Sequence, residues 1–353
     1  MRYYAGLDVG GTSGRVLFAK EDGTEIGQYE GIGCAFNTDG PVLGREKYTV
    51  LMQEALRAYL LAPEDCGGIC TAASGVDSLQ QEQDLADIFA ALGFSRDRTM
   101  VLNDCEVFLH LTEEPSLVVI SGTGSVCYGR NRRGHVFRTG GWNHVLSDEG
   151  SAFWIGLQAI RAAGETMDGR RQAEKLTAAV QEACGFRTLE KADVFVTQHL
   201  TDKRRIGRLS GLVGDLAAQG DAESVRILQE AADQVFALVR DTAVRMEVDD
   251  GPAGTRTGAA GMEADDSSTG AQAAASGMET DGSCANAAGE KKSTPDSPVK
   301  LWLWGSVCVK NPVFRTRLVE RTARELPGLS PDIPEQTALQ TALRTAIRAF
   351  PLH

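Results

Sequence analysis

Two segments of the chain repeat one pattern of strand, glycine loop, strand and turn. One reads LDVGGTSGRVLFAKEDG and contains Gly11 and Gly23, and the other reads VISGTGSVCYGRNRRG and contains Gly122 and Gly134. In both, twelve residues separate the loop glycine from the turn glycine, and the residues after the loop favour a strand. The repeat predicts an internal duplication of a unit of three antiparallel strands.

The two glycine loops are candidates for binding phosphate, because glycine lets the backbone approach a ligand closely. In Rossmann and P-loop sites such a loop opens a helix, whereas here a strand follows each loop. Two hairpins of this kind, facing each other, would hold a polyphosphate from both sides. Glycine loops also occur as plain turns, so the residues around them have to decide between the two interpretations.

The remainder of the sequence alternates strand and helix patterns and becomes mainly helical after the second hairpin. We therefore expect an α/β protein whose two halves each begin with a three-stranded antiparallel unit. The expected helices are 45–61, 81–92, 150–163, 170–183, 207–218 and 222–246, and the further strands are 68–73, 99–102 and 301–304.

Bulk composition excludes several classes of protein. The 353 residues, 42% of them hydrophobic, predict two domains, and the net charge of −12 argues against a nucleic-acid binder. No apolar run approaches the ~20 residues of a membrane span, and no signal peptide is recognisable, so we expect a cytoplasmic protein. The eight cysteines and five histidines are scattered, which predicts reduced thiols and no structural metal site.

The segment from 249 to 298 differs from the rest of the chain. It contains no Val, Ile, Leu or aromatic residue. Such a composition buries too little apolar surface to offset chain entropy, so we expect a disordered insertion. Lengthening a loop from about 5 to about 50 residues costs only ~2 kcal/mol of closure entropy, which the fold can tolerate.

Asp104 is the first candidate for chemistry. It follows the expected strand 99–102 and precedes a helical run, so it would lie at the carboxyl end of a parallel strand, where open α/β sheets hold ligands. There it would act as a general base. The alternative interpretation is that Asp104 only caps the helix that follows.

A second group of residues suits a sugar. GGWNHVLSDEGSA places Trp142 and Asp148 just before a helix, and a pyranose offers hydroxyls to a carboxylate and an apolar face to an indole. Asn37 and Ser74 add polar side chains from the first half. The alternative is that Asp148 and Glu149 only favour the helix N-terminus.

The chain resembles the N-acetylglucosamine kinase branch of the sugar kinase, Hsp70 and actin superfamily, grouped with the BadF/BadG/BcrA/BcrD ATPases. The resemblance covers about 3–248 and 300–325. DVGGT is shared across the superfamily, whereas GGWNHVLSDEGSAFWIG is specific. The motifs that carry it are DVGGT at 8–12, NDC at 103–105, ISGTGS at 120–125, GGWNHVLSDEGSAFWIG at 140–156 and WGSV at 304–307.

The resemblance implies a two-domain actin-like ATPase (ribonuclease H-like) fold. One domain would span 1–113 and be completed by a C-terminal helix at 336–353. The other would span 114–335 and be interrupted by the insertion at 249–298. The family often has a Gly-Ala pair in its last helix, but Gln-Thr-Ala-Leu at 340–343 lacks that glycine.

The resemblance also implies an ATP-dependent kinase that phosphorylates the 6-hydroxyl of an N-acetylated amino sugar, foremost N-acetylglucosamine, and leaves a homodimer open. Mg²⁺ would lie near Asp8, through water, and Asp104 would be the catalytic base. The other implied contacts are Gly10, Gly11 and Thr12 in the first phosphate loop, Gly122, Thr123, Gly124 and Ser125 in the second, Gly305 and Ser306 at the adenosine, and Asn37, Ser74, Trp142 and Asp148 at the sugar.

Alternatives remain open at this point. N-acetylmuramic acid or glucosamine are alternative substrates, because the sequence gives neither the depth nor the width of the pocket. A BadF-type ATPase activator would need a cysteine that bridges a dimer in a Cys-Ala-Ala-Gly-like stretch, and the sequence has no such stretch. A non-catalytic sugar-binding regulator of the repressor type would carry a helix-turn-helix before the first strand, which we expect to begin by Tyr3.

Overall fold

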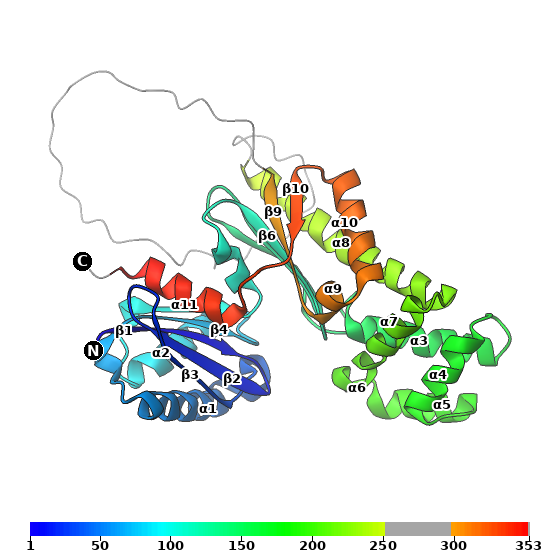
Figure 1. The fold of residues 1–353 in the computed structure, drawn as a ribbon. Helices are drawn as coiled ribbons and strands as arrows, with labels where there is room; N and C mark the ends of the chain where they lie inside the picture. Colours follow the sequence, from blue (N-terminus) through cyan, green and yellow to red (C-terminus); the bar gives the residue numbers. More distant parts are fainter. Residues whose placement is uncertain (251–297, 352–353) are drawn as a thin grey trace, which may run out of the picture.

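The computed structural model describes residues 1–250 and 298–351. Within these residues the chain forms two five-stranded sheets, each in its own half of the molecule (Figure 1). No helix in this described part is long and apolar enough to cross a membrane. The predicted α/β class is confirmed.

The first half is a sheet with helices on both faces. Its elements are β1 (Tyr3–Val9), β2 (Ser13–Ala19), β3 (Glu25–Ile32), α1 (Phe36–Tyr59), η1 (Pro63–Asp65), β4 (Cys66–Ala73), α2 (Leu79–Ala91), η2 (Arg96–Arg98), β5 (Thr99–Asn103), η3 (Glu106–Leu111) and the late helix α11 (Ala338–Ala349). Side chains alternate along β1, so that Tyr3 and Leu7 pack with α1 and α2 whereas Tyr4 packs with α11. Both faces of β1 are therefore buried.

The second half combines a sheet with a larger set of helices. Its elements are β6 (Ser116–Ser121), β7 (Ser125–Arg130), β8 (Val136–Gly140), α3 (Ala152–Met167), α4 (Glu174–Cys184), α5 (Leu189–His199), α6 (Lys203–Gly207), α7 (Leu209–Ala218), α8 (Ala222–Asp250), β9 (Val299–Trp304), α9 (Ser306–Lys310), α10 (Pro312–Glu325) and β10 (Leu329–Asp332). The sequence did not predict α5 or α6, in which few residues are buried. The buried ones are Ala192 and Phe195 in α5 and Ile206 in α6.

The two sheets share one topology. The strand orders are β3-β2-β1-β4-β5 and, in the corresponding sense, β8-β7-β6-β9-β10. In each sheet the first three strands are antiparallel, and the two later strands run parallel to the first strand. The predicted duplication of a strand, glycine loop and strand unit is therefore confirmed.

Helix α1 begins earlier than expected. The sequence predicted a helix over 45–61 from its apolar stripe. Gly40 and Pro41, which are typical of a break, lie before that range. The structure instead continues the helix back to Phe36 and places the irregularity inside it, with Gly40 at a φ of 74°. Asn37 consequently lies in the first turn of a helix.

Helix α8 ends later than expected, at Asp250 instead of Met246. The carboxylate of Asp249 accepts a hydrogen bond of 2.6 Å from Asn131 Nδ2 and lies 2.8 Å from His135 Nδ1, both in the turn between β7 and β8. The expected start of the insertion at residue 249 is therefore wrong, because these contacts hold the end of the helix. The rest of the predicted disordered insertion, 251–297, lies outside the described residues.

Helix α11, red in Figure 1, returns to the first sheet and lies along β1 and β4. The packing is close at Gly6, where a Cβ atom would lie 2.4 Å from the backbone nitrogen of Leu343. The small residue that permits this approach is thus on the strand, although the helix lacks the glycine of the family pattern. This packing supports the division 1–113 with 336–353, and 114–335, which we keep as a proposal.

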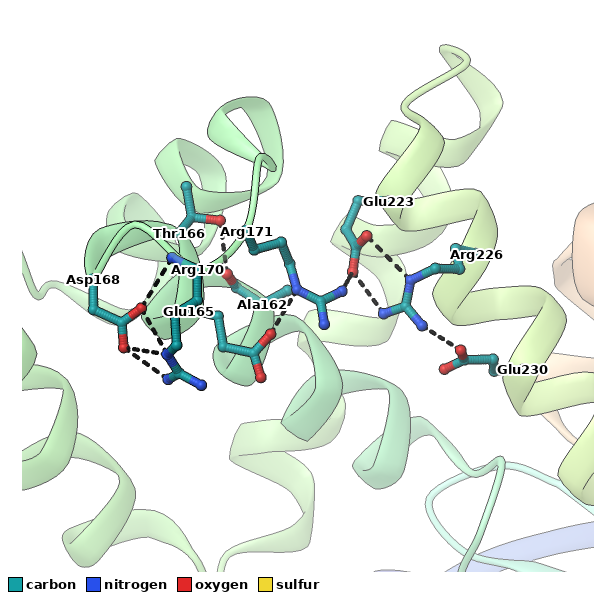
Figure 2. Close-up of polar contacts among 9 residues, drawn as sticks. All are labelled: Ala162, Glu165, Thr166, Asp168, Arg170, Arg171, Glu223, Arg226 and Glu230. Atoms are coloured by element: carbon teal, nitrogen blue, oxygen red, sulfur yellow. Dashed lines mark hydrogen bonds and ion pairs between the residues drawn. The ribbon is translucent and has the colours of Figure 1, made fainter.

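An ion-pair network joins helices of the second half far along the chain from the glycine loops (Figure 2). Arg171 Nη1 and Arg226 Nη2 lie 2.5 and 2.7 Å from the same carboxylate oxygen of Glu223, at the start of α8. Arg171 also pairs with Glu165 of α3 at 2.6 Å. The network fixes the start of α8 against the end of α3.

Candidate active site

A cavity of about 330 Å³ lies between the two halves. It brings together the ends of strands from both sheets, as expected for an open α/β protein. Its lining includes the predicted site residues Asp8, Asp104 and Gly305. The complete lining is Asp8, Arg15, Asp104, Ile120, Trp304, Gly305, Thr337 and Ala338.

Asp104 directly follows β5, and its backbone N–H donates to Ala73 O at 3.3 Å. Its carboxylate accepts a hydrogen bond of 3.4 Å from Cys105 Sγ. Burial raises the pKa of Asp104; the charge of Asp8 raises it further, whereas hydrogen bonds from Cys105 and Ser74 lower it. No side chain caps η3, so the alternative that Asp104 is a helix cap is not supported.

Asp8 lies near the end of β1, directly across from Arg15 of β2, and the two form an ion pair. Burial raises the pKa of Asp8, and the neighbouring Arg15 opposes this shift. The described residues contain no cluster of three metal-ligating side chains. Mg²⁺ commonly uses one or two carboxylates with waters and substrate phosphates, so Asp8 and Asp104 in one cavity fit that ion.

The first glycine loop is open to solvent. Gly10 N donates to Ser13 O at 3.0 Å and closes the turn, while Gly11 and Thr12 are exposed. Arg204 of α6 reaches this loop from the second half and donates to Thr12 Oγ1 at 2.5 Å. The sequence gave no sign of Arg204, because the helix that carries it was not predicted.

The second glycine loop is braced by the protein itself. Asp148 is buried, and one of its carboxylate oxygens accepts from Ser125 N at 3.3 Å. The other oxygen pairs with Lys203 Nζ of α6 at 2.7 Å. A Cβ atom on Gly124 would lie 2.7 Å from the Asp148 carboxylate. Thr123 is exposed beside them, and Gly122 N donates to Gly124 O at 2.9 Å.

The turn expected at the adenosine begins where β9 ends. Gly305 has a φ of 91°, and a Cβ atom there would lie 2.3 Å from Ser121 O. Only glycine suits this position, which lets β9 turn into α9 at Ser306.

Of the predicted sugar-side residues, Asn37 contacts a further carboxylate, that of Asp77, whereas Asp148 lies at the second glycine loop. Asn37 Nδ2 donates to Asp77 Oδ2 at 3.3 Å, and Ser74 N donates to Val9 O at 2.9 Å, which places Ser74 beside the first loop. Trp142 is 63% exposed, and the Arg138 guanidinium lies 4.1 Å from its ring centroid. The sequence singled out neither Asp77 nor Arg138 for a role, although each adjoins a quoted motif.

The duplicated sheets and the cleft between them define an actin-like ATPase fold. A proposed N-acetylglucosamine kinase from Chromobacterium violaceum has a similar structure, with a TM-score of 0.66, 20% identity and coverage of 98% of this chain and 99% of that one. Another, from Porphyromonas gingivalis, has a TM-score of 0.62 at 14% identity, covering 99% of both chains.

The chain belongs to the BadF/BadG/BcrA/BcrD ATPase family, whose model matches residues 5–261. It is 30% identical to the N-acetylmuramic acid/N-acetylglucosamine kinase of Clostridium acetobutylicum over 248 residues, 68% of this chain and 79% of that protein. It is 24% identical to the N-acetyl-D-glucosamine kinase of Dictyostelium discoideum over 257 residues, 70% of this chain and 81% of that protein. The predicted family is confirmed.

Proposed function

We propose that the protein is an ATP-dependent sugar kinase that transfers a phosphoryl group to the 6-hydroxyl of an N-acetylated amino sugar. The preferred substrate is N-acetylglucosamine, with N-acetylmuramic acid as the alternative. The observation that carries the proposal is the position of Asp104, which lines one cavity with Asp8 and Gly305 where strands of the two sheets end. The activities of the two curated relatives support the same substrate class.

In the proposed mechanism Asp104 accepts the proton of the 6-hydroxyl as the oxygen attacks the γ-phosphate. Burial raises the pKa of Asp104, which makes its carboxylate a stronger base than an exposed aspartate. A loose phosphoryl-transfer transition state asks the protein mainly for positioning and charge stabilisation. The glycine loops supply backbone N–H groups for the phosphates, and Asn37, Ser74, Trp142 and Asp148 hold the sugar.

Mg²⁺ would neutralise phosphate charge, and Asp8 is the residue placed to hold it, through water. Arg15 now pairs with Asp8. In the loaded enzyme we expect Arg15 to turn toward the phosphates, because its guanidinium and the metal would compete for one carboxylate.

A coupled assay of ADP release over a panel of amino sugars tests the proposal. The panel contains N-acetylglucosamine, N-acetylmuramic acid, glucosamine and glucose, and NMR of the product locates the phosphate. We expect the N-acetylated sugars to give the highest kcat/KM and the phosphate to be on O6. ADP release that none of these sugars stimulates would contradict the proposed function.

A further inference from the structure

Asp77, in the loop between β4 and α2, collects hydrogen bonds from three different elements. Its Oδ1 accepts from Arg138 Nη1 of β8 at 2.8 Å and from Asn103 Nδ2 of β5 at 3.2 Å. Its Oδ2 accepts from Asn37 Nδ2 of α1 at 3.3 Å. Both carboxylate oxygens are thus engaged, and one of the donors comes from the other half of the molecule.

The guanidinium of Arg138 is also held by the loop that carries Trp142. Its Nη2 donates to Gly141 O at 2.6 Å and its Nε to Gly140 O at 3.2 Å. The guanidinium plane stacks over Trp142 at 4.1 Å from the ring centroid. A rigid planar cation of this kind fixes direction as well as distance, which a lysine would not do.

The pair therefore connects the sugar-side residues of the two halves. Asn37 contacts Asp77, Asp77 contacts Arg138, and Arg138 stacks on Trp142. Asn103, the remaining partner of Asp77, immediately precedes Asp104. Within the described residues, the hydrogen bonds of the pair thus lead to the sugar side and the base, and none of them leads to either glycine loop.

The elements that this pair joins, and not its burial, separate a positioning role from a merely stabilising one. The side chains of Arg138 and Asp77 are 14% and 25% exposed. A partly buried ion pair is weak evidence for stability, because desolvation offsets much of the attraction, but its directional hydrogen bonds restrain geometry. The similarly buried Arg171–Glu223 pair, at 30% and 11% exposure, joins helices of one half only (Figure 2).

We propose that the Asp77–Arg138 ion pair is a positioning element that sets the geometry of the amino-sugar site across the cleft. The proposal rests on the proposed function, because it assigns these residues to the sugar side of that site. Asp77 orients Asn37 from one half, and Arg138 orients Trp142 from the other. Losing either partner should therefore weaken sugar binding and leave ATP binding almost unchanged.

Kinetics of Asp77→Asn, Arg138→Gln and the double variant test the proposal. We expect each single change to raise KM for N-acetylglucosamine by about tenfold, the usual effect of losing a hydrogen bond to a charged group. KM for ATP should stay within about twofold. The double variant should lose little more than the worse single variant, because both act through one contact. Arg138→Lys keeps the charge and should recover part of the loss.

Glu223→Gln is the matched control, because it breaks the ion-pair network of Figure 2 away from the site. It should lower Tm and leave KM for the sugar unchanged. Variants at Asp77 and Arg138 that lower Tm alone, or whose effects on KM add independently, would overturn the positioning role. A wild-type protein that phosphorylates no amino sugar would overturn both the proposed function and this inference. The variant outcomes above, in an active wild-type enzyme, would overturn the positioning role alone, so the two failures are distinguishable.

Discussion

The two halves of the molecule share one strand topology but bring different charged groups to the cleft between them. The first half contributes mainly carboxylates, from strand ends and the loops that follow, together with Arg15, and the second half contributes mainly cations, from β8 and α6, together with Asp148. Duplication therefore accounts for the strand topology of the two halves but not for the charged side chains that they bring to the cleft. The carboxylates are Asp8, Asp77 and Asp104, and the cations are Arg138, Lys203 and Arg204.

The two glycine loops also differ. The first has exposed residues at Gly11 and Thr12, whereas the second is tied to Asp148 through Ser125 N. A Cβ atom on Gly11 would lie 3.3 Å from Ala35, but one on Gly124 would lie 2.7 Å from Asp148. A side chain at Gly11 thus meets only a tight contact with Ala35, whereas the protein itself needs the glycine of the second loop.

Asp104→Asn tests the acidic side of the comparison and should have the largest effect. We expect turnover to fall by ~10²-fold or more, the usual scale for a positioned base, while ATP affinity is largely kept. Burial raises the pKa of Asp104, so folding disfavours its ionised form, and the destabilisation grows as the pH rises through that pKa and is complete above it. The variant should therefore have a higher Tm at neutral pH.

Steady-state kinetics and thermal unfolding check both parts of this prediction. Asp97→Asn, at an exposed aspartate in the same half, is the control and should change neither quantity. Near wild-type turnover in Asp104→Asn would remove the base from the mechanism.

Gly11→Val and Gly124→Val test the difference between the loops. Each should weaken MgATP binding by roughly tenfold or more, because a β-branched side chain blocks the approach of phosphate to backbone N–H groups. Only Gly124→Val should also lower Tm, since its side chain meets Asp148. Calorimetry and thermal unfolding measure the two effects. Normal MgATP binding by either folded variant would mean that its loop is only structural.

Arg204→Gln tests the cationic side. Because Arg204 reaches Thr12 of the first loop from the second half, its charge is expected to stabilise the bound phosphates, and kcat/KM for ATP should fall by about fivefold, or ~1 kcal/mol. Arg205→Gln is the matched control on the same helix, since Arg205 lies over the Phe195 ring, 5.9 Å from its centroid. Equal effects of the two variants would mean that general charge is responsible.

Cys105→Ala should have a smaller effect, confined to the pH profile. The Cys105 thiol donates to Asp104 and lowers its pKa, opposing the effect of burial. Removing that hydrogen bond should raise the pKa of Asp104, so the acid limb of kcat/KM should move to higher pH while the plateau stays nearly constant. A shift toward lower pH would contradict the assignment of that limb to Asp104.

Replacing 251–297 with a short Gly/Ser linker should have the smallest effect. This segment contains no Val, Ile, Leu or aromatic residue that could join a core, so turnover and sugar KM should stay near wild type. Asp249 has to be kept, because its contacts with Asn131 and His135 fix the end of α8. Loss of turnover in the shortened protein would show that the segment has a role in catalysis.

Local motifs predicted the parts of the site that depend on backbone shape. Glycine loops and strand ends mark Gly11, Gly124 and Asp104 in the sequence, and the structure has strands and turns where those signals predict them. The cross-cleft contacts were not predictable in this way. Asp77 and Arg138 are separated by 61 residues, so no local periodicity encodes their contact.

The secondary-structure errors have the same kind of cause. The Gly40-Pro41 pair is typical of a helix break, yet Phe36 is buried in the core and extends α1 before that point. The helix α6 is only five residues long and mostly polar, and it was missed together with the three cations it carries. Tertiary packing determined both the start of α1 and the formation of α6, and local sequence patterns carry no information on tertiary packing.

The packing of α11 against β1 has a consequence for synthesis of the chain. The strand that carries Tyr4 is synthesised well before the helix that covers its sheet face, which ends at Ala349. At the usual 5–20 residues per second the interval is on the order of tens of seconds. During that time one apolar face of the first sheet is uncovered. We therefore expect chaperones that bind exposed apolar surfaces to bind the nascent chain.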